Sequence, residues 1–366
     1  MYEADNESST IKIYRTVVMK TILSLCIPTY NRAELLRSAL LSVVPQLTEC
    51  GYEVEIVVSD NCSPDNTKEV VEWAQQFGPI RYHRNADNIG AARNALFVVN
   101  ELARGEFSWI LGDDDFVRPG ALKRIVEIIK KYPEIDFVFV SLCHITLDQL
   151  KNYPAPVSSN DLPAELPPDN QIGEDRYVEK WEQLVDPKVS GVFLGATQVS
   201  VFRRTPWCEH SKKLIIDKAF SSLESTYPHV IAMAHCMMGK KAYYIGTPQV
   251  IVVDGAREWF DFVPMIILVR LNEVIDLYEQ VGVPKEQIER CRKHLISESG
   301  SSIIKMLLTP RIPGREYVSK QQFFSRYWHF KELWLSLVRA IMMMLIPTRV
   351  WDFIKKSMKG IRSRVQ

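Results

Sequence analysis

Short apolar runs alternate with amphipathic stretches along the first 140 residues of the chain. The apolar runs predict buried strands at residues 22–27, 54–59 and 80–83, in the segment ending at Asp113, and at 135–140. Apolar residues at helical spacing predict intervening helices at 32–46, after Asp65 or Asn66, at 91–103 and at 121–131. This alternation predicts an α/β fold, with a mostly parallel, Rossmann-like sheet flanked by helices on both faces.

The second half of the chain has a less regular pattern. Residues 152–172 hold five prolines among polar residues and predict a loop or linker. The pattern then predicts a helix at 174–185, a strand at 195–203, a helix at 230–238, and two strands at 243–245 and 250–253. Residues 259–308 have a helical pattern that breaks near Gly282, so we expect a helical C-terminal extension.

An apolar and aromatic stretch near the C-terminus precedes a basic tail. Residues 333–346 span 14 positions and contain Arg339, so they are too short and too charged to cross a membrane unaided. The basic residues that follow are Arg349, Lys355, Lys356, Lys359, Arg362 and Arg364. This order is typical of an amphipathic segment lying on an anionic membrane surface. The alternative is a helix packed on the rest of the protein or on a second copy, so a homo-oligomer stays open.

Polar residues follow the predicted strands of the first half. They are Thr29 and Tyr30, Asp60 and Asn61, Arg84 and Asn88, and Asp113, Asp114 and Asp115. Ligands of open α/β sheets bind in the crevice beyond the carboxyl ends of the strands, so one crevice should collect these side chains. The three adjacent carboxylates repel one another, and a hard divalent cation would remove that cost. The alternative interpretation is a solvated acidic turn.

Composition and motifs exclude several classes of protein. The net charge of +1 over 366 residues argues against a nucleic-acid binder with a broad basic face. Seven scattered cysteines form no CxxC pair, which predicts reduced thiols in a cytosolic protein. Neither a GxGxxG loop nor a GxxxxGK[ST] loop follows the first strand. No signal peptide and no apolar run of about 18 residues is apparent.

Four motifs resemble those of family 2 glycosyltransferases with the GT-A fold. They are residues 24–32 (SLCIPTYNR), 58–65 (VSDNCSPD), 88–94 (NIGAARN) and 112–115 (GDDD), the last standing where the family carries its DxD motif. They occur in the family's order within residues 22–140. Within the family, the chain is similar to bacterial enzymes that extend lipid-linked surface polysaccharide precursors such as O-antigen, including abequosyltransferase-like proteins.

The resemblance implies a metal-dependent glycosyltransferase that uses a nucleotide-diphosphate sugar and Mn²⁺ or Mg²⁺. Asp115 would bind the metal, and Asp113 would meet the ribose or the metal. The other donor-binding candidates are Pro28, Thr29, Tyr30, Arg32, Asp60, Asn88, Arg93, Asp114 and Arg257. For Arg32, Tyr30, Asp60, Arg93 and Arg257 the alternative is an ordinary surface, core or turn residue.

The general base is not identified by a motif. An inverting transferase needs a group that takes the proton from the acceptor hydroxyl. The family often supplies an aspartate of a Glu-Asp pair, and this chain departs from that pattern with residues 222–229 (SLESTYPH). Glu224 and His229 are the candidates, and an inverting or a retaining outcome stays open.

These inferences together give an expected domain plan. Residues 1–20 form a disordered extension, 21–258 the catalytic domain, 259–318 a helical region and 319–366 a membrane-associating tail. The catalytic domain has a nucleotide half (21–150) and an acceptor half (173–258). The expected acceptor is a saccharide on a polyprenyl diphosphate, at the cytoplasmic face of the cell membrane, and nucleic acid is not an expected partner. A nucleotidyltransferase and a non-catalytic membrane-bound scaffold are the rival hypotheses.

Overall fold

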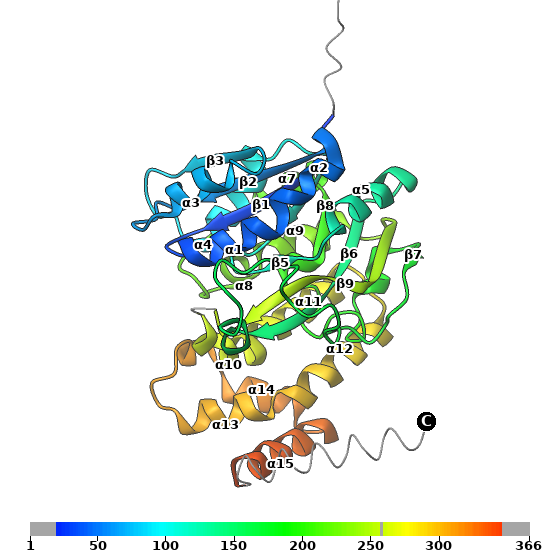
Figure 1. Cartoon of the computed structure of the whole chain (residues 1–366). Helices are drawn as coiled ribbons and strands as arrows, with labels where there is room; N and C mark the ends of the chain where they lie inside the picture. The colour runs from blue at the N-terminus through cyan, green and yellow to red at the C-terminus, as the bar shows by residue number, and fades with distance from the viewer. Residues whose placement is uncertain (1–19, 257–258, 346–366) are drawn as a thin grey trace, which may run out of the picture.

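A computed structural model describes residues 20–256 and 259–345 of the chain (Figure 1). Three sequence predictions lie outside the described residues. They are the N-terminal extension apart from Lys20, the donor-binding role of Arg257, and the basic tail beyond Leu345.

The first half of the chain forms the parallel part of a mixed sheet. Its strands are β1 (Leu23–Thr29), β2 (Val54–Asp60), β3 (Ile80–Arg84) and β4 (Phe107–Ile110), and they lie in the order β3-β2-β1-β4. All three strand pairs are parallel. The helices are α1 (Ala33–Val43), α2 (Leu47–Cys50), α3 (Thr67–Ala74), α4 (Ala91–Phe97) and α5 (Ala121–Lys131). Because Thr29 pairs with Asp60 and Asp60 with Arg84, these three strands end level with one another.

The second half of the chain extends this sheet with strands of both directions. They are β5 (Phe116–Val117), β6 (Phe137–Thr146), β7 (Arg176–Val178), β8 (Ser200–Arg203) and β9 (Ala242–Asp254). Strand β8 is antiparallel to both β4 and β6, whereas β6 and β9 are parallel. The described residues thus form a nine-stranded sheet, and the predicted α/β class with a helical C-terminal extension is confirmed. The predicted parallel pairing of strands is found among the first four strands and between β6 and β9.

Four predicted elements of the second half are wrong in type or extent. Residues 174–185 form the edge strand β7 and a 3₁₀ turn instead of a helix, because residues 176–178 pair with β9 while Trp181 is buried. Only the end of the predicted strand 195–203 is extended. The two strands predicted at 243–253 form the single strand β9, whose pairing with β6 shifts register across 246–249.

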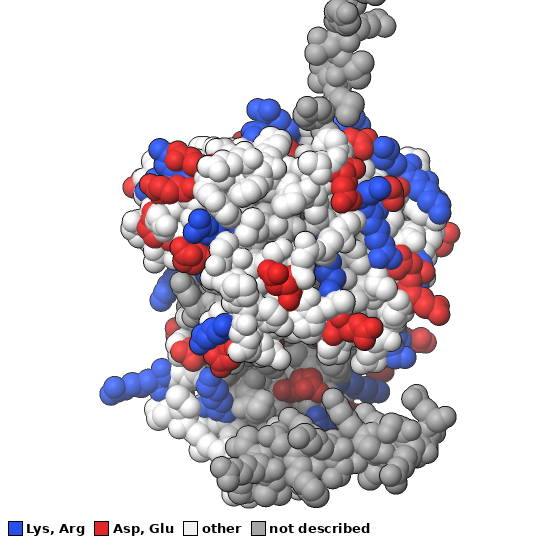
Figure 2. Space-filling view, in the orientation of Figure 1, with Lys and Arg blue, Asp and Glu red and all other residues white. Residues whose placement is uncertain are grey.

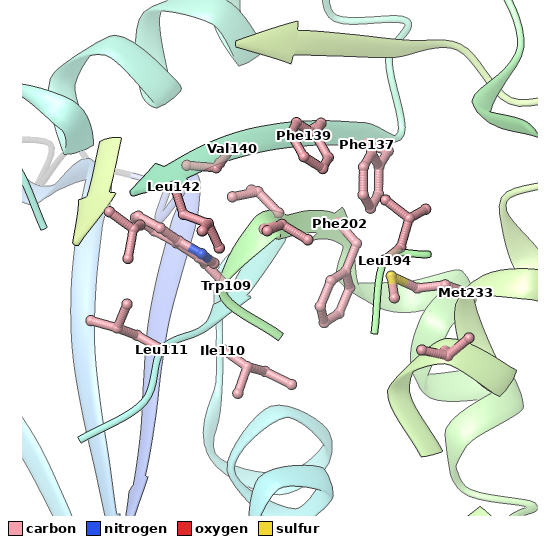
Figure 3. Packing of buried hydrophobic residues seen from close by; sticks show 14 of the residues in the cluster. Trp109, Ile110, Leu111, Phe137, Phe139, Val140, Leu142, Leu194, Phe202 and Met233 are labelled. Carbon is pink, nitrogen blue, oxygen red and sulfur yellow. The ribbon is translucent and has the colours of Figure 1, made fainter. Parts of the chain in front are cut away.

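Trp109, in the strand before the acidic triplet, lies in the buried hydrophobic core (Figure 3). Its cross-strand neighbour is Val201 of β8, which in turn pairs with Val138 of β6. The Trp109 indole N–H also donates to the carbonyl oxygen of Gln198 at 2.8 Å. Trp109, Phe139 and Phe202 are each at most 2% exposed, so the strand before the triplet is held firmly in the core.

The remaining helices follow or flank the strands of the second half. They are α6 (Leu147–Leu150), α7 (Arg204–Ser211), α8 (Leu223–Thr226), α9 (Pro228–Cys236), α10 (Val263–Met265), α11 (Leu271–Gln280), α12 (Lys285–Glu298), α13 (Gly300–Leu308), α14 (Lys320–Tyr327) and α15 (Lys331–Leu345). Helices α13 to α15 lie together at the end of the molecule opposite β3 (Figure 1). The predicted break near Gly282 is confirmed. None of the described helices is long and apolar enough to cross a membrane.

Helix α15 approaches α13 closely at Gly300. A Cβ atom built on Gly300 would lie 2.2 Å from the carbonyl oxygen of Ser336. Because that oxygen belongs to backbone, a side chain at this position has to separate the two helices.

Gly300→Ala is therefore expected to destabilise the protein by about 1–3 kcal/mol, the usual cost of overpacking. Urea denaturation measures this change in the free energy of unfolding. Gly173→Ala is the matched control, since a Cβ atom there meets no atom within 4 Å and the backbone is not in the left-handed region. Equal stability of the two variants would contradict the close packing of α13 on α15.

Candidate functional site

The loops after β1 and β2 are joined by hydrogen bonds. The backbone N–H of Asn31 donates to Ser63 Oγ at 2.9 Å, and the N–H of Ala33 donates to Asp65 Oδ2 at 2.9 Å. Asn31 and Cys62 both have left-handed backbones, with φ of 54° and 66°. Such conformations are uncommon outside glycine, although asparagine adopts them more readily than most residues. The paired loops thus form a fixed floor at the carboxyl edge of the sheet.

Asp60 lies fully buried in this floor. Its carboxylate accepts hydrogen bonds from the Ser63 N–H (2.8 Å), the Tyr82 hydroxyl (2.6 Å) and the Arg84 guanidinium (2.9 Å). Burial raises the pKa of Asp60, but the hydrogen bonds from Ser63, Tyr82 and Arg84 outweigh it and bring the pKa below its usual value. Asp60 therefore stays ionised. A carboxylate has about four acceptor sites, so these contacts leave little capacity for a nucleobase.

A chain of amide side chains continues from the floor to the start of α4. Asn61 donates to Asn88 Oδ1 at 2.7 Å and accepts from Asn85 at 3.1 Å. Asn85 and Ser59 both donate to Asn94 Oδ1, at 3.1 Å and 2.7 Å. The predicted donor-binding residue Asn88 thus belongs to a network whose other amides were not singled out from the sequence.

Arg32 neutralises two members of the acidic triplet. Its guanidinium contacts Asp113 at 2.7 Å and Asp114 at 2.9 Å, and it also donates to the carbonyl oxygen of Ala256. The hydroxyl of Thr29 donates to the second oxygen of Asp113 at 2.8 Å. The structure therefore brings Thr29, Arg32, Asp113 and Asp114 together from the ends of two neighbouring strands.

The electrostatics of Asp113 show that the triplet is not a solvated turn. Asp113 is 4% exposed, and this burial raises its pKa to about 6, although the Arg32 charge acts in the opposite direction. The turn itself depends on Gly112. A Cβ atom there would lie 2.6 Å from Asp115 Oδ2 and 2.8 Å from Asp114 Oδ1, so a side chain would displace the carboxylates.

Asp115 contacts the second half of the chain. It is buried, and its Oδ2 accepts a hydrogen bond from the amide of Gln198 at 3.0 Å. Gln198 was not predicted as a site residue, and the only sequence signal was an amide within a stretch predicted as a strand. Phe193 and Leu194, which begin this loop, have left-handed backbones, and the Tyr278 hydroxyl donates to the Phe193 carbonyl oxygen at 2.8 Å. The loop that places Gln198 is therefore held by α11.

Arg93 and Glu224 both contact one segment of the second half of the chain. The guanidinium of Arg93 donates to the carbonyl oxygen of Ile216, with Nε at 3.0 Å. Glu224 Oε2 accepts from the N–H of Ile215 at 3.2 Å. Arg93, predicted to bind the donor, and Glu224, predicted as a base, thus contact neighbouring residues of the chain. Arg93 and Glu224 are themselves distant from each other in the sequence.

His229 is held close to the loop that carries Gln198. It is 7% exposed, and its Nε2 lies 3.0 Å from the carbonyl oxygen of Gly195. Burial lowers the pKa of His229 to about 4, so the ring is neutral at pH 7 and carries its proton on Nε2, facing the carbonyl. A base works best when its pKa is near the working pH, so this lowered pKa argues against His229 in that role.

The two remaining candidates near the end of β1 are Tyr30 and Pro28. Tyr30 is 38% exposed, as expected of a side chain available to a ligand. Pro28 is partly buried and lies in β1, opposite Ser59.

The donor set suits a divalent cation held jointly with a substrate. No group of three or more His, Cys, Asp and Glu residues within the described part of the chain could hold a metal alone. Mg²⁺ is usually bound by one or two carboxylates together with substrate phosphates. Two buried carboxylates, Asp113 and Asp115, at the crevice match that requirement.

Comparison with known proteins identifies the class of this domain. Residues 24–163 match the family model described as Glycosyl transferase family 2. This segment is a glycosyltransferase domain, and its family is family 2, so the resemblance carried by the four motifs is confirmed.

Relatives and a solved structure share parts of the chain. It is 42% identical over 103 residues to abequosyltransferase RfbV of Salmonella typhimurium, covering 28% of this chain and 30% of that protein. It is 36% identical over 110 residues to GalNAc(5)-diNAcBac-PP-undecaprenol beta-1,3-glucosyltransferase of Campylobacter jejuni, covering 29% and 33%. The chain thus spans about a third of the length of these curated relatives. A mannosyltransferase of Pyrobaculum calidifontis in complex with GDP-Man and Mn²⁺ has a TM-score of 0.47 at 15% identity and covers 88% of each chain.

The buried neutral His229 predicts a pH-dependent loss of stability. Below pH 6.5 the unfolded chain binds a proton at this residue, whereas the folded protein does so only near pH 4. Folded stability should therefore fall as the pH drops through this window, by about 3 kcal/mol from this residue alone. His229→Gln keeps an N–H donor and should remove this part of the pH dependence in urea denaturation between pH 7 and 4. The exposed His235, replaced by glutamine, is the control, and parallel losses in wild type and His229→Gln would contradict the prediction.

Proposed function

We propose that the protein is a metal-dependent glycosyltransferase of the GT-A type. It transfers a sugar from a nucleotide-diphosphate donor to a saccharide acceptor carried on a polyprenyl diphosphate. The observation that carries the proposal is the buried acidic triplet at the carboxyl edge of the parallel sheet, within a family 2 domain. The names of the two relatives, an abequosyltransferase and a glucosyltransferase for an undecaprenol-linked glycan, support this substrate class. The family match favours glycosyl transfer over nucleotidyl transfer.

The crevice residues divide the work of donor binding. Tyr30 and the loop held by Asp60 offer a wall for the nucleobase, and Asn88 fixes the loop that precedes α4. Asp113 and Asp115 would hold the cation with the donor diphosphate, and Arg32 keeps the Asp113–Asp114 pair in place. When bound, the cation would neutralise the charge that develops on the leaving diphosphate.

Proton removal from the acceptor needs a base outside the acidic triplet. Glu224 is partly buried at the first turn of α8 and accepts only one hydrogen bond from the described residues, so it has capacity to accept an acceptor hydroxyl. We assign it as the general base of an inverting reaction. The neutral His229 holds the loop of Gln198 through Gly195 and acts as a positioning residue.

Helix α15 supports peripheral association with an anionic membrane. Six of its exposed apolar residues lie on one face of the helix by their spacing, namely Trp334, Leu335, Val338, Ile341, Met342 and Leu345, while Met343 and Met344 near its end are exposed beside that face. The buried residues Leu333, Ser336 and Ala340 form the opposite face, which packs on the protein. An exposed apolar face on a helix that already packs on the protein is typical of an interfacial segment.

Replacement of Asp115 should abolish metal-dependent turnover of the donor. A bound cation contributes several kcal/mol to such a reaction, so Asp115→Asn should lower the rate by a factor of at least about 100. The assay measures Mn²⁺- or Mg²⁺-dependent hydrolysis of UDP-, GDP-, CDP- and dTDP-sugars by the purified protein. Asp148→Asn is the control and should keep full activity, since Asp148 is exposed and its one ion pair with a described residue is to Lys151. An Asp115→Asn enzyme with wild-type turnover would refute the proposed site.

Charged substitutions on the exposed face of α15 should release the protein from membranes. Burying a leucine-sized side chain contributes about 1.5–3 kcal/mol, so Leu335→Glu with Ile341→Glu should lower the vesicle-bound fraction at least tenfold. Flotation with phosphatidylglycerol-containing vesicles measures that fraction. Phe77→Glu, a similar change at an exposed aromatic residue beyond α3, is the control. Unchanged flotation of the double variant would count against α15 as the membrane contact.

A further inference from the structure

A cavity apart from the donor crevice lies between residues 218–219 and the C-terminal helices. It has a volume of about 380 Å³ and is formed by residues 218–219, Phe262 and the connection 310–317. Its size is at the lower end for small-ligand sites, which suits a compact head group. It contains none of the residues assigned above to the donor site.

Three of the eleven described residues that line this cavity are basic. Lys218 and Arg311 are exposed, and neither forms an ion pair with a described residue. Arg315 donates to the carbonyl oxygens of Met306 and Thr309, at 2.8 Å and 3.0 Å, which fixes its guanidinium at the end of α13. Among the described lining residues Glu316 is the one that is acidic, so they carry an excess of positive charge. Figure 2 shows Lys and Arg side chains, with some acidic ones, around the region of α10 and α13.

The wall formed by the acceptor half is held from below by Arg270. This arginine is 4% exposed and donates to the carbonyl oxygens of Phe220 and Ser221, at 3.0 Å and 2.7 Å. It pairs with Glu273 at 2.7 Å and lies over the ring of Tyr317 at 5.3 Å. The cavity is therefore preformed, since its two sides share one buried cation.

Apolar side chains border the basic lining. Phe262 stacks on Phe220 with ring centroids 4.6 Å apart. Phe260, Leu307 and Leu308 are exposed by 61%, 47% and 63%, and they precede or follow lining residues by a few positions. Helix α13, which carries Leu307 and Leu308, packs on α15 and thus adjoins the membrane contact proposed above. A basic cavity beside an apolar border fits an amphiphile with an anionic head.

We propose that this cavity binds the diphosphate of the polyprenyl-diphosphate-linked acceptor, with Lys218 and Arg311 as its main cationic contacts. The assignment rests on the proposed function and adds a site for the acceptor lipid. The cavity wall at Ala219 is five residues from Glu224, so the two are at most about 18 Å apart. An acceptor anchored here directs its saccharide toward the proposed base, because a short glycan spans that distance.

The test measures binding of farnesyl diphosphate to the full chain by equilibrium dialysis. Lys218→Glu with Arg311→Glu should weaken binding at least tenfold, while the Kd for nucleotide diphosphate with Mn²⁺ stays unchanged. Both residues are exposed, so thermal denaturation should show a folded variant. Lys123→Glu is the matched control, at an exposed lysine of α5, a helix that lies far from α10 and α13 in Figure 1.

Further probes separate the sources of the anion. Inorganic diphosphate should compete with farnesyl diphosphate, and farnesol should bind at least tenfold more weakly. Equal affinity of wild type and double variant for farnesyl diphosphate would overturn the proposal. So would a double variant that loses binding to phosphatidylglycerol vesicles alone, since the site would then serve a phospholipid head group. Failure of the wild type to hydrolyse any donor would refute the proposed function. The dialysis result would still decide whether the cavity binds a diphosphate.

Discussion

Compensation of buried negative charge is the constraint on which the site depends. Asp113 and Asp115 are almost fully buried, and the ionised form of a buried carboxyl group is costly unless it is paired or hydrogen-bonded. Arg32 comes from the loop after β1, Thr29 from the end of β1, and Gln198 from the loop before β8. The triplet is therefore stable only when β1, the loop after it and the loop before β8 are all in place. This requires both halves of the chain to be folded.

The need to compensate buried charge also explains the strained loop before β8. Gln198 can reach Asp115 only if residues 193–195 turn sharply, and Phe193 and Leu194 adopt left-handed backbones to do so. Such strain persists when its surroundings over-determine it. Here Tyr278 holds the Phe193 carbonyl oxygen and His229 that of Gly195. A Cβ atom on Gly195 would lie 2.8 Å from the Val192 carbonyl oxygen, so the turn also needs glycine.

Sequence patterns predicted the parts of the structure that local periodicity determines. The first four strands and α5 follow the apolar pattern, and the acidic triplet lies where strand-end reasoning placed it. Residues 174–185 have apolar side chains at helical spacing, but the open edge of β9 pairs with residues 176–178 and overrides that preference. Gln198 could not be recognised, because its role depends on Asp115, a partner 83 positions away in sequence. Both features depend on contacts between residues far apart in the sequence, which a local pattern of apolar and polar residues does not contain.

The C-terminal helices belong to the same core as the sheet. Trp181 packs edge-on against Tyr278 of α11, with ring centroids 5.9 Å apart, and both side chains are fully buried. Arg270, at the start of α11, needs partners because an unpaired buried guanidinium would be strongly destabilising. It finds them in Glu273 and in the backbone of Phe220 and Ser221, just before α8. A change in the position of α11 would therefore move the segment that leads to Glu224, so α11 and this segment form one mechanical unit.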